Sequence, residues 1–226
     1  DPRLSVLFAP GSSNTVIVGM PNGSTSDTYV GTDGVTVPGV TDRHVYAQTH
    51  PALRGKDVPM VFQTYAEVEF LKAEAAIRGW ISSSAKEHYD KGVTAAMKML
   101  KQLYPASTAI TDAEISAYLA GPGAYDASKG WEMAMNEYWK ATFLNEYEAY
   151  ANWRRTGYPT LTPTKHPNSV SNNQIFRRMI YPGGESATNG DNYAAAVARQ
   201  GADDFTTRMW LSLIHISEPT RPRSIS

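Results

Sequence analysis

The sequence contains no cysteine, which excludes a disulfide framework and a thiolate metal site. It also lacks any apolar run of about 18 residues, so it predicts no membrane-spanning helix. Neither sign of charge is in surplus: 21 Lys and Arg stand against 22 Asp and Glu, for a net charge of −1. Nucleic-acid-binding domains usually carry a basic surplus. We therefore expect no nucleic-acid partner.

Sequence signatures of catalysis and metal binding are also missing. There is no His-Glu-x-x-His motif, no Gly-x-Ser-x-Gly motif and no phosphate-binding glycine-rich loop. The histidines other than His215 are scattered, at His44, His50, His88 and His166. We expect no catalytic residue, cofactor or metal. One alternative stays open: Glu67 and Glu74 share a helix face and could serve as a carboxylate pair in glycoside hydrolysis. The other interpretation is helix capping and ion pairing.

The composition predicts a packed globular core, with 42% hydrophobic and 19% charged residues. Residues 1–58 are rich in Gly, Pro, Ser, Thr and Asp. This pattern indicates short strands and turns within long, irregular loops. Loops of this kind often carry binding surfaces on a rigid scaffold.

Residues 59–158 have helical periodicity. Apolar residues recur at helical spacing from Thr64 to Gly79. Ser84 and Glu87 have the spacing of a capping box and open a second helix, which Pro105 stops. The two helices form a hairpin of the tetratricopeptide kind. Only one such pair is visible, so the sequence shows no repeat array.

A second capping box, Thr111 with Glu114, opens a short helix, and one long helix is predicted from about Ser128 to Arg155. Its wide aromatic face comprises Trp131, Met135, Trp139, Phe143, Tyr147 and Tyr150. We expect Trp139, Phe143 and Trp153 to lie in the core. Gly157 and Pro159 end the helix.

Residues 159–210 are predicted to be loops with one short helix, "NYAAAVARQG", which has Asn192 as its N-cap and Gly201 at its end. The predicted fold class is thus mainly α: a helical scaffold with long irregular loops and a few short strands.

Tyrosines outside the helical stripes are the candidate ligand-binding residues. The chain has 13 Tyr and 5 Trp. Exposed aromatic rings stack on sugar faces or grip peptides with little loss of side-chain entropy. The candidates are Tyr29, Tyr46, Tyr125, Tyr158 and Tyr181.

The closing stretch, "LSLIHISEPTRPRSIS" at 211–226, has no hydrophobic period. Reverse translation of its first eleven residues fits the adapter of a widely used transposase-based sequencing library. We expect 211–226 to be adapter read as protein, and the gene to be cut just after Trp210. The alternative is a disordered tail.

Several fragments occur in an order that resembles the SusD/RagB family, over nearly all of residues 1–210: "DPRL", "TYAEVEFLKAEAAIRGW", "AKEHYDKGVTAAM", "EAYANWRRTGYP", "FRRMIYPGGE", "NGDNYAAAVARQGADD" and "RMW". The residues of these motifs to which we assign structural roles are Glu67, Glu74, Trp153, Arg154, Arg155, Gly157, Pro159, Arg178, Tyr181, Pro182, Glu185, Asn192 and Tyr193. The sequence departs from the family at Ile175-Phe176, and at Glu137-Tyr138-Trp139-Lys140, where the family has a "QKW" helix.

The resemblance implies a nutrient-binding subunit of an outer-membrane uptake system. SusD-like proteins are surface-exposed lipoproteins of Bacteroidota that bind glycans or other nutrients for a SusC-like TonB-dependent transporter, and they are not enzymes. Their fold is a tetratricopeptide-like helical scaffold. This chain resembles its C-terminal part, so a signal peptide and a lipidated Cys are expected upstream of Asp1. Arg154 or Arg155 would hold loop carbonyls or an acid such as Glu185. A glycoside hydrolase and a protein-interaction scaffold remain the alternatives.

Overall fold

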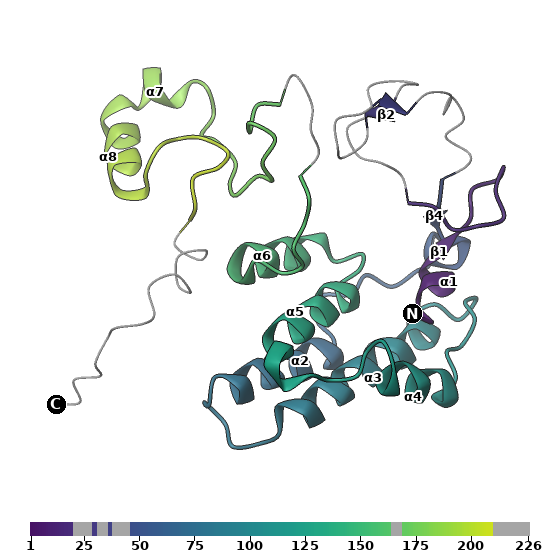
Figure 1. The fold of residues 1–226 in the computed structure, drawn as a ribbon. Coiled ribbons are helices and arrows are strands. Elements are labelled where there is room, and N and C mark those ends of the chain that lie inside the picture. The colour runs from purple at the N-terminus through teal and green to yellow at the C-terminus, as the bar shows by residue number, and fades with distance from the viewer. Residues whose placement is uncertain (20–28, 31–35, 38–45, 164–168, 210–226) are drawn as a thin grey trace. The chain divides into compact units, whose positions relative to one another are not determined.

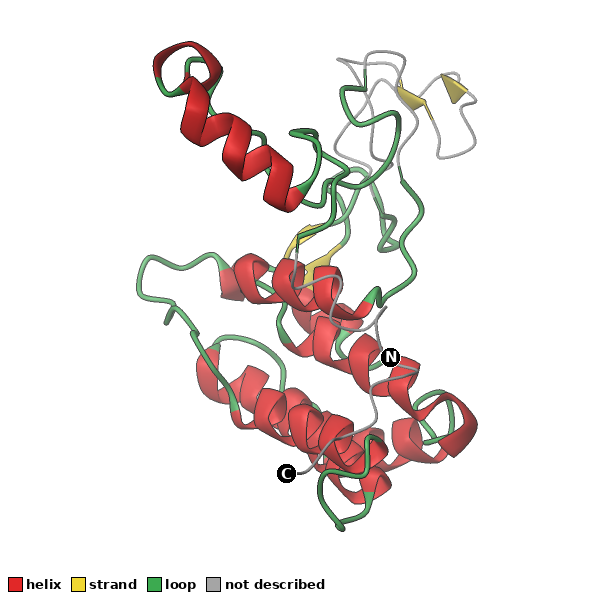
Figure 2. Ribbon diagram, turned by 90° about the vertical axis from the view of Figure 1, so that its left-hand side faces the viewer, coloured by secondary structure: helices red, strands yellow, loops and turns green. Residues whose placement is uncertain are grey.

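A computed structural model describes residues 1–19, 29–30, 36–37, 46–163 and 169–209 (Figure 1). The described chain is mainly helical, with only two-residue strands (Figure 2), which confirms the predicted fold class. It divides into two compact units, Asp1–Met20 with Val40–Asn152, and Pro21–Gly39 with Trp153–Ser226. The division at residues 58 and 158, drawn from composition, stays a prediction. The closing segment 211–226 lies outside the described residues.

The first unit is a group of helices with one small strand pair. Strands β1 (Phe8–Ala9) and β4 (Gln48–Thr49) pair antiparallel, with Phe8 opposite Thr49. Helix α6 begins in this unit and ends in the other one. The remaining elements are α1 (Leu4–Leu7), η2 (Pro51–Leu53), α2 (Tyr65–Ile77), α3 (Ala85–Leu103), α4 (Asp112–Ala120), η3 (Ala127–Lys129), α5 (Gly130–Ala141) and the start of α6 (Glu146–Thr156).

The N-termini of α2, α3 and α4 are fixed by side-chain caps. Before α2, the backbone N–H of Glu67 donates to Thr64 Oγ1 (3.2 Å) and that of Thr64 donates to Glu67 Oε1 (3.0 Å). Thr111 and Glu114 form the same reciprocal box at α4, as predicted. At α3, Ser84 accepts from the backbone N–H of Glu87 at 3.4 Å, and only this half of the predicted box forms.

The prediction of one helix from Ser128 to Arg155 is wrong, because the chain breaks between α5 and α6. The Thr142 hydroxyl turns back onto the carbonyl oxygens of Tyr138 (3.0 Å) and Trp139 (3.2 Å). Leu144 then adopts a left-handed conformation with φ of 70°. A β-branched residue whose hydroxyl bonds the preceding turn, followed by a left-handed residue, ends an α-helix.

Helices α2, α3 and α5 pack around the core of this unit. The ring of Phe70 is fully buried and lies 6.4 Å from the rings of both Tyr89 and Tyr138. Gly92 on α3 allows this approach: a Cβ at that position would lie 2.7 Å from the Phe70 ring. The glycine therefore sets how closely α2 and α3 can meet.

The break after α5 changes the predicted aromatic core. Trp139 and Phe143 were expected in the core, but both are only half-buried. Phe143 packs edge-on against Phe8, with centroids 5.0 Å apart, and Tyr147 is 91% exposed. Trp153 is buried, as predicted. A single helix would have kept these rings on one face, whereas two helices point them in different directions.

The second unit carries the end of α6, the short helix α7 (Glu185–Thr188), helix α8 (Gly190–Gln200) and the antiparallel pair β2 (Tyr29–Val30) and β3 (Thr36–Val37). The predicted N-cap of α8, Asn192, is wrong. Asn189 holds the N-cap position, and the Asn192 side-chain amide donates to Asn189 Oδ1 at 2.7 Å from inside the helix. Gly201, with φ of 101°, closes α8 as predicted.

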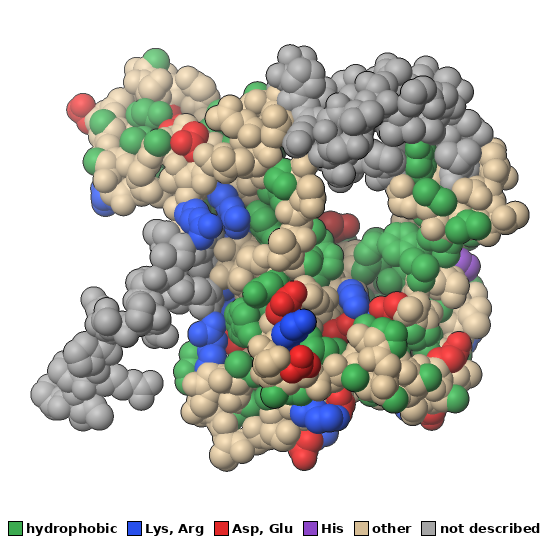
Figure 3. Space-filling model, in the orientation of Figure 1, with side chains coloured by type: hydrophobic (Ala, Val, Ile, Leu, Met, Phe, Trp, Pro, Cys, Tyr) green, Lys and Arg blue, Asp and Glu red, His purple; other side chains and the backbone are tan. Residues whose placement is uncertain are grey.

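The described surface has mixed charge, and acidic and basic side chains alternate over the face that Figure 3 shows. No helix within the described ranges is both long and apolar enough to cross a bilayer. The interspersed charges agree with the absence of a basic surplus in the sequence.

In Gly92→Ala the added methyl group collides with the Phe70 ring, which should cost about 1–3 kcal/mol. The better helix propensity of Ala returns about 1 kcal/mol, so the free energy of unfolding should fall by up to about 2 kcal/mol. Urea denaturation measures the change. The matched control is Lys91→Ala, at an exposed neighbouring position on α3, which should stay within about 0.5 kcal/mol of wild type. A stabilised Gly92→Ala variant would contradict the close helix approach.

Candidate ligand-binding site

A buried ion pair joins the start of the chain to α5. Arg3 is 2% exposed and Glu137 is 3% exposed, and Arg3 Nη1 lies 2.8 Å from Glu137 Oε2. The other edge of the guanidinium donates to Asp1, from Nε to Oδ1 (2.9 Å) and from Nη2 to Oδ2 (2.7 Å). The backbone N–H of Arg3 also donates to Asp1 Oδ1 (3.1 Å). The "DPR" turn is thus locked by its own aspartate, and its arginine is aimed at the helix.

Two further donors contact Glu137. The Tyr118 hydroxyl of α4 and the Lys140 ammonium each donate to Glu137 Oε1 at 2.7 Å. Burial pushes the pKa of Glu137 up, but the charges of Arg3 and Lys140 outweigh it and hold the pKa below its usual value. Burial beside this carboxylate raises the pKa of the Tyr118 hydroxyl, which therefore stays a donor.

This network includes two of the residues at which the sequence departs from the family pattern. Glu137 and Lys140 belong to the Glu-Tyr-Trp-Lys segment of α5. Both contact the "DPRL" motif, because Glu137 pairs with Arg3 and Lys140 lies 3.5 Å from Asp1. The sequence identified the "DPRL" motif and the Glu137–Lys140 segment separately, with no sign that they meet. No spacing rule predicts that a residue at position 3 meets one at position 137.

A cavity of about 240 Å³ opens beside the network. Apolar side chains from α1, β1 and the end of α5 form most of its wall, and charged groups of the network form the rest. Its lining residues are Asp1, Arg3, Leu4, Leu7, Phe8, Trp139, Lys140 and Phe143. The indole of Trp139, expected in the core, instead faces this cavity.

A second hollow of about 360 Å³ lies between the start of α2 and the second half of α3. Its rim carries the exposed ring of Tyr65 with Gln63, Lys98 and Gln102, while Met99 and Leu103 contribute apolar surface. The lining combines one aromatic ring with amide and ammonium groups.

A hydrogen-bonded chain runs across the α2–α3 hairpin. Ser83 Oγ lies 2.8 Å from His88 Nε2, and His88 Nδ1 lies 2.6 Å from Glu69 Oε2. The connectivity is that of a Ser-His-acid triad. However, Glu69 also accepts from Lys72 (3.0 Å), and neither Ser83 nor His88 lines either cavity. The contacts of Glu69 give it a role in fixing the hairpin.

Glu67 and Glu74, the carboxylates of the hydrolase alternative, have structural partners. Glu67 caps α2 through Thr64, and Glu74 Oε1 pairs with Arg78 Nε at 2.9 Å. Burial raises the pKa of Glu67, although the Thr64 bonds oppose the rise. Capping and ion pairing, the other interpretation of this spacing, describe both residues.

Arg78 stabilises an exposed aromatic surface at the end of the hairpin. Its guanidinium lies 5.1 Å from the Trp80 ring and 4.7 Å from the Trp131 ring. Trp80 is 63% exposed, and its backbone N–H donates to the carbonyl of Ala75 at 2.8 Å. The indole is therefore held in place at the surface.

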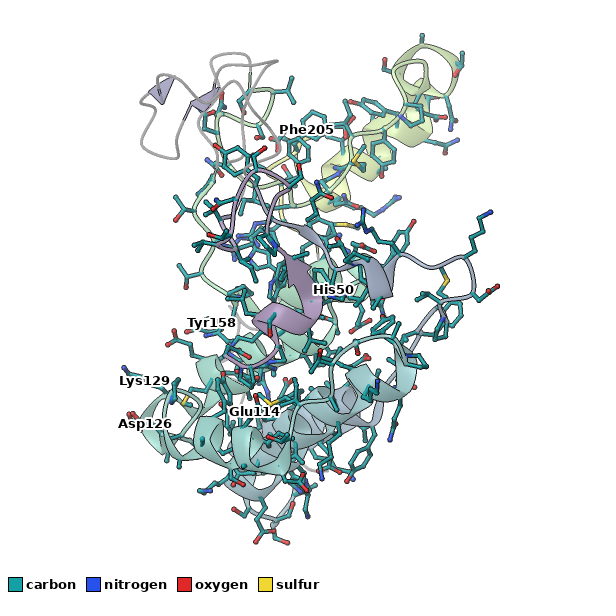
Figure 4. The ribbon with its side chains drawn as sticks, turned by 90° about the vertical axis from the view of Figure 1, so that its right-hand side faces the viewer. His50, Glu114, Asp126, Lys129, Tyr158 and Phe205 are labelled. Atoms are coloured by element: carbon teal, nitrogen blue, oxygen red, sulfur yellow. The ribbon has the colours of Figure 1, made fainter. Side chains whose placement is uncertain are left out.

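The five candidate tyrosines differ in burial and surroundings. Tyr46 is only 7% exposed, so its burial conflicts with the prediction that it contacts a ligand. Tyr125 is half-buried against Tyr89, with centroids 5.2 Å apart. Tyr158 is half-buried beside Pro159 (Figure 4), and the side chain of Tyr29 lies outside the description. Tyr46 and Tyr125 are therefore packing positions, and a ligand role for the four tyrosines stays a prediction.

The fifth tyrosine, Tyr181, belongs to a cluster around Asp203 in the second unit. Arg178 is 5% exposed and pairs with Asp203 Oδ1 at 2.8 Å. The backbone N–H of Tyr181 (3.1 Å) and the hydroxyl of Tyr193 (3.2 Å) also donate to Asp203. The two rings meet edge-on, with centroids 5.7 Å apart, and Arg178 lies over Tyr181. Three predicted motif residues are thus held by an aspartate to which we gave no role.

The expectation for the "NWRRTGYP" motif is confirmed in one part. Arg154 Nη1 donates to the carbonyl of Arg177 at 3.3 Å, so it holds a loop carbonyl. Glu185 accepts from the side chain of Asn189 (3.2 Å), and Asp203 pairs with Arg178 in the same unit. Two of the remaining motif positions have special backbone geometry: Gly157 ends α6 with φ of 80°, and the Tyr158–Pro159 peptide bond is cis. Pro182 is exposed and Arg155 is half-buried.

Aromatic packing continues next to this cluster. The ring of Phe205, labelled in Figure 4, stacks on that of Phe176 with centroids 4.7 Å apart. The backbone N–H of Arg177 donates to the carbonyl of Phe205 at 2.7 Å. Phe176 is one of the two positions that depart from the family before the Arg pair. In the described ranges, no three His, Asp or Glu side chains gather as a metal site.

The α2–α3 hairpin and α5, packed around an apolar core and flanked by hollows that combine aromatic and polar groups, define a helical scaffold. The sequence matches the SusD-like family, described as starch-binding and associating with the outer membrane, over residues 1–182. The chain belongs to this family. The description of the family names binding.

Solved structures support the same assignment. A chitin-binding protein is 31% identical, with a TM-score of 0.77, over 94% of this chain and 46% of its own. A SusD-like protein from Bacteroidetes is 33% identical, with a TM-score of 0.70, over 78% of this chain and 35% of its own. A chitin-binding SusD homologue from Flavobacterium johnsoniae shares the fold at 23% identity, with a TM-score of 0.63, over 94% of this chain and 46% of its own.

The chain spans less than half the length of these solved relatives. The comparison with curated proteins gave no match.

The Glu69 network predicts an acid-dependent loss of stability. Burial opposes ionisation, but bonds from His88, Lys72 and Tyr65 lower the pKa of Glu69 from 4.5 to about 2. A carboxyl group with a lowered folded-state pKa contributes stability above its unfolded pKa, and this is lost as the pH falls through the folded value. Glu69→Gln should therefore be less stable than wild type at pH 7, on the order of 3 kcal/mol.

The gap between wild type and Glu69→Gln should narrow from about pH 4.5 towards pH 2, as followed by urea denaturation across this range. Glu146→Gln, at an exposed carboxylate, is the control and should track wild type. A gap that is constant with pH would show that the network does not depend on the Glu69 charge.

Proposed function

We propose that the protein is the glycan-binding subunit of an outer-membrane nutrient-uptake system. The observation that carries this proposal is the match to a starch-binding family over residues 1–182. The chitin-binding relative with 31% identity supports β-linked N-acetylglucosamine chains as the proposed ligand class. Starch fragments are the second ligand class, because the family description names them.

The geometry agrees with binding without turnover. Glycoside hydrolysis needs two carboxyl groups flanking the scissile bond, one of them free to act as nucleophile or base. Glu67 is engaged in a capping box, Glu74 pairs with Arg78, and both are buried. A purely protein-binding scaffold would explain the hairpin, but it would not account for the family's starch-binding description.

The proposed subunit works with a partner. Following the resemblance in the sequence, a SusC-like TonB-dependent transporter is the proposed partner, and the subunit passes its glycan to this channel. The proposed location is the outer surface of the outer membrane, reached through a lipid anchor upstream of Asp1. The family description, which places its members at the outer membrane, supports this location.

Isothermal titration calorimetry with chitohexaose tests the ligand. We expect saturable binding with a dissociation constant below about 1 mM, which corresponds to about −4 kcal/mol. Cellohexaose is the matched control, because it has the same β-1,4 linkage without the acetamido groups, and maltohexaose represents starch. Absence of heat with all three sugars would contradict the proposal.

Product analysis on the same mixtures tests the absence of turnover. The oligosaccharides should keep their length after prolonged incubation. Shortened products that disappear in Glu67→Gln or Glu74→Gln would support the hydrolase instead.

A further inference from the structure

We propose that the cavity beside Arg3 and Glu137 is a glycan subsite, in which one sugar ring stacks on Trp139 and turns its polar substituents towards Asp1 and Lys140. This inference rests on the proposed function and goes beyond it by assigning residues. None of the lining residues was among the tyrosines that the sequence suggested.

The size and wall of the cavity fit a small, two-faced ligand. Its volume of about 240 Å³ lies just below the range of about 300–1,000 Å³ that holds drug-sized molecules. Trp139, Phe143 and Phe8 supply aromatic surface, and Leu4 and Leu7 supply aliphatic surface. A pyranose ring presents an apolar face of C–H groups to such a wall and keeps its hydroxyl groups at the edge, where polar side chains can reach them.

The side-chain charges at the cavity cancel, which favours a neutral ligand. Arg3 is balanced by Asp1 and Glu137, and Lys140 lies 2.7 Å from Glu137 and 3.5 Å from Asp1. Two cationic side chains thus face two anionic ones. An anion would have to compete with the carboxylates for the same donors. A fully apolar occupant would remove water from these charges without replacing its hydrogen bonds.

The polar groups of the cavity are held before a ligand arrives. Lys140 also donates to the Tyr118 hydroxyl at 3.0 Å, while its side chain stays 39% exposed. Asp1 is held by three bonds from Arg3, and its side chain is 28% exposed. Both groups are therefore fixed yet accessible, and fixed partners reduce the entropy lost on binding.

Trp139→Ala removes the stacking surface and Leu4→Trp fills the cavity from its half-exposed edge. Calorimetric titration of the chain with chitohexaose should show roughly 5- to 150-fold weaker binding for Trp139→Ala, by analogy with other aromatic stacking. Leu4→Trp should weaken binding by at least a similar factor. Trp80→Ala, the same truncation at a 63% exposed indole outside the cavity, should bind within about threefold of wild type.

Thermal melts establish that the variants are folded. If Trp139→Ala loses its cooperative melt, Leu4→Trp decides the question alone, since position 4 tolerates bulk at the surface. Wild-type affinity in the folded variants, or an equal loss in Trp80→Ala, would overturn the subsite while the glycan-binding function stands. A different result would contradict the proposed function itself: wild type would give no heat with any of the three sugars.

Discussion

The Arg3–Glu137 ion pair is the interaction on which the first unit most depends. It ties the opening turn of the chain to α5, brings in α4 through Tyr118, and positions Lys140 at the cavity. Two buried charges are costly to desolvate, and removing one partner leaves the other uncompensated. The five-residue network of Asp1, Arg3, Tyr118, Glu137 and Lys140 therefore favours one arrangement of three segments that are far apart in sequence.

Local signals predicted the helices well. The capping box at Thr111 and the glycine at 157 each act through neighbours within four residues, so the sequence contains the whole interaction. The box at Thr64 is equally local, but it was not predicted. The break after Ala141 could not be predicted in the same way. Aromatic spacing continues through it, and the left-handed Leu144 leaves no mark in the periodicity. The family resemblance added the helical scaffold, which a single hairpin did not establish.

The candidate site was less predictable because its residues meet only after folding. Tyrosine content pointed to loops, yet Tyr46 proved buried and Tyr181 proved to pack against Tyr193. Trp139, assigned to the core from its place in the aromatic stripe, lines the cavity. The role of Asp203 could not be predicted for the same reason. Its carboxylate accepts from Arg178, Tyr181 and Tyr193, and these donors reach it only in the folded chain. The family motifs thus pointed to the three donor residues but not to Asp203, the acceptor that they share.

The balance of charge around the cavity has a consequence for the medium in which the protein works. Dissolved salt screens attraction between separated charges over about 8 Å at physiological ionic strength. A ligand held by net charge would therefore be released as salinity rises. A neutral sugar held by ring stacking and by side chains already paired with one another has little such attraction to lose. Capture of a sugar at the proposed subsite would thus be largely independent of ionic strength.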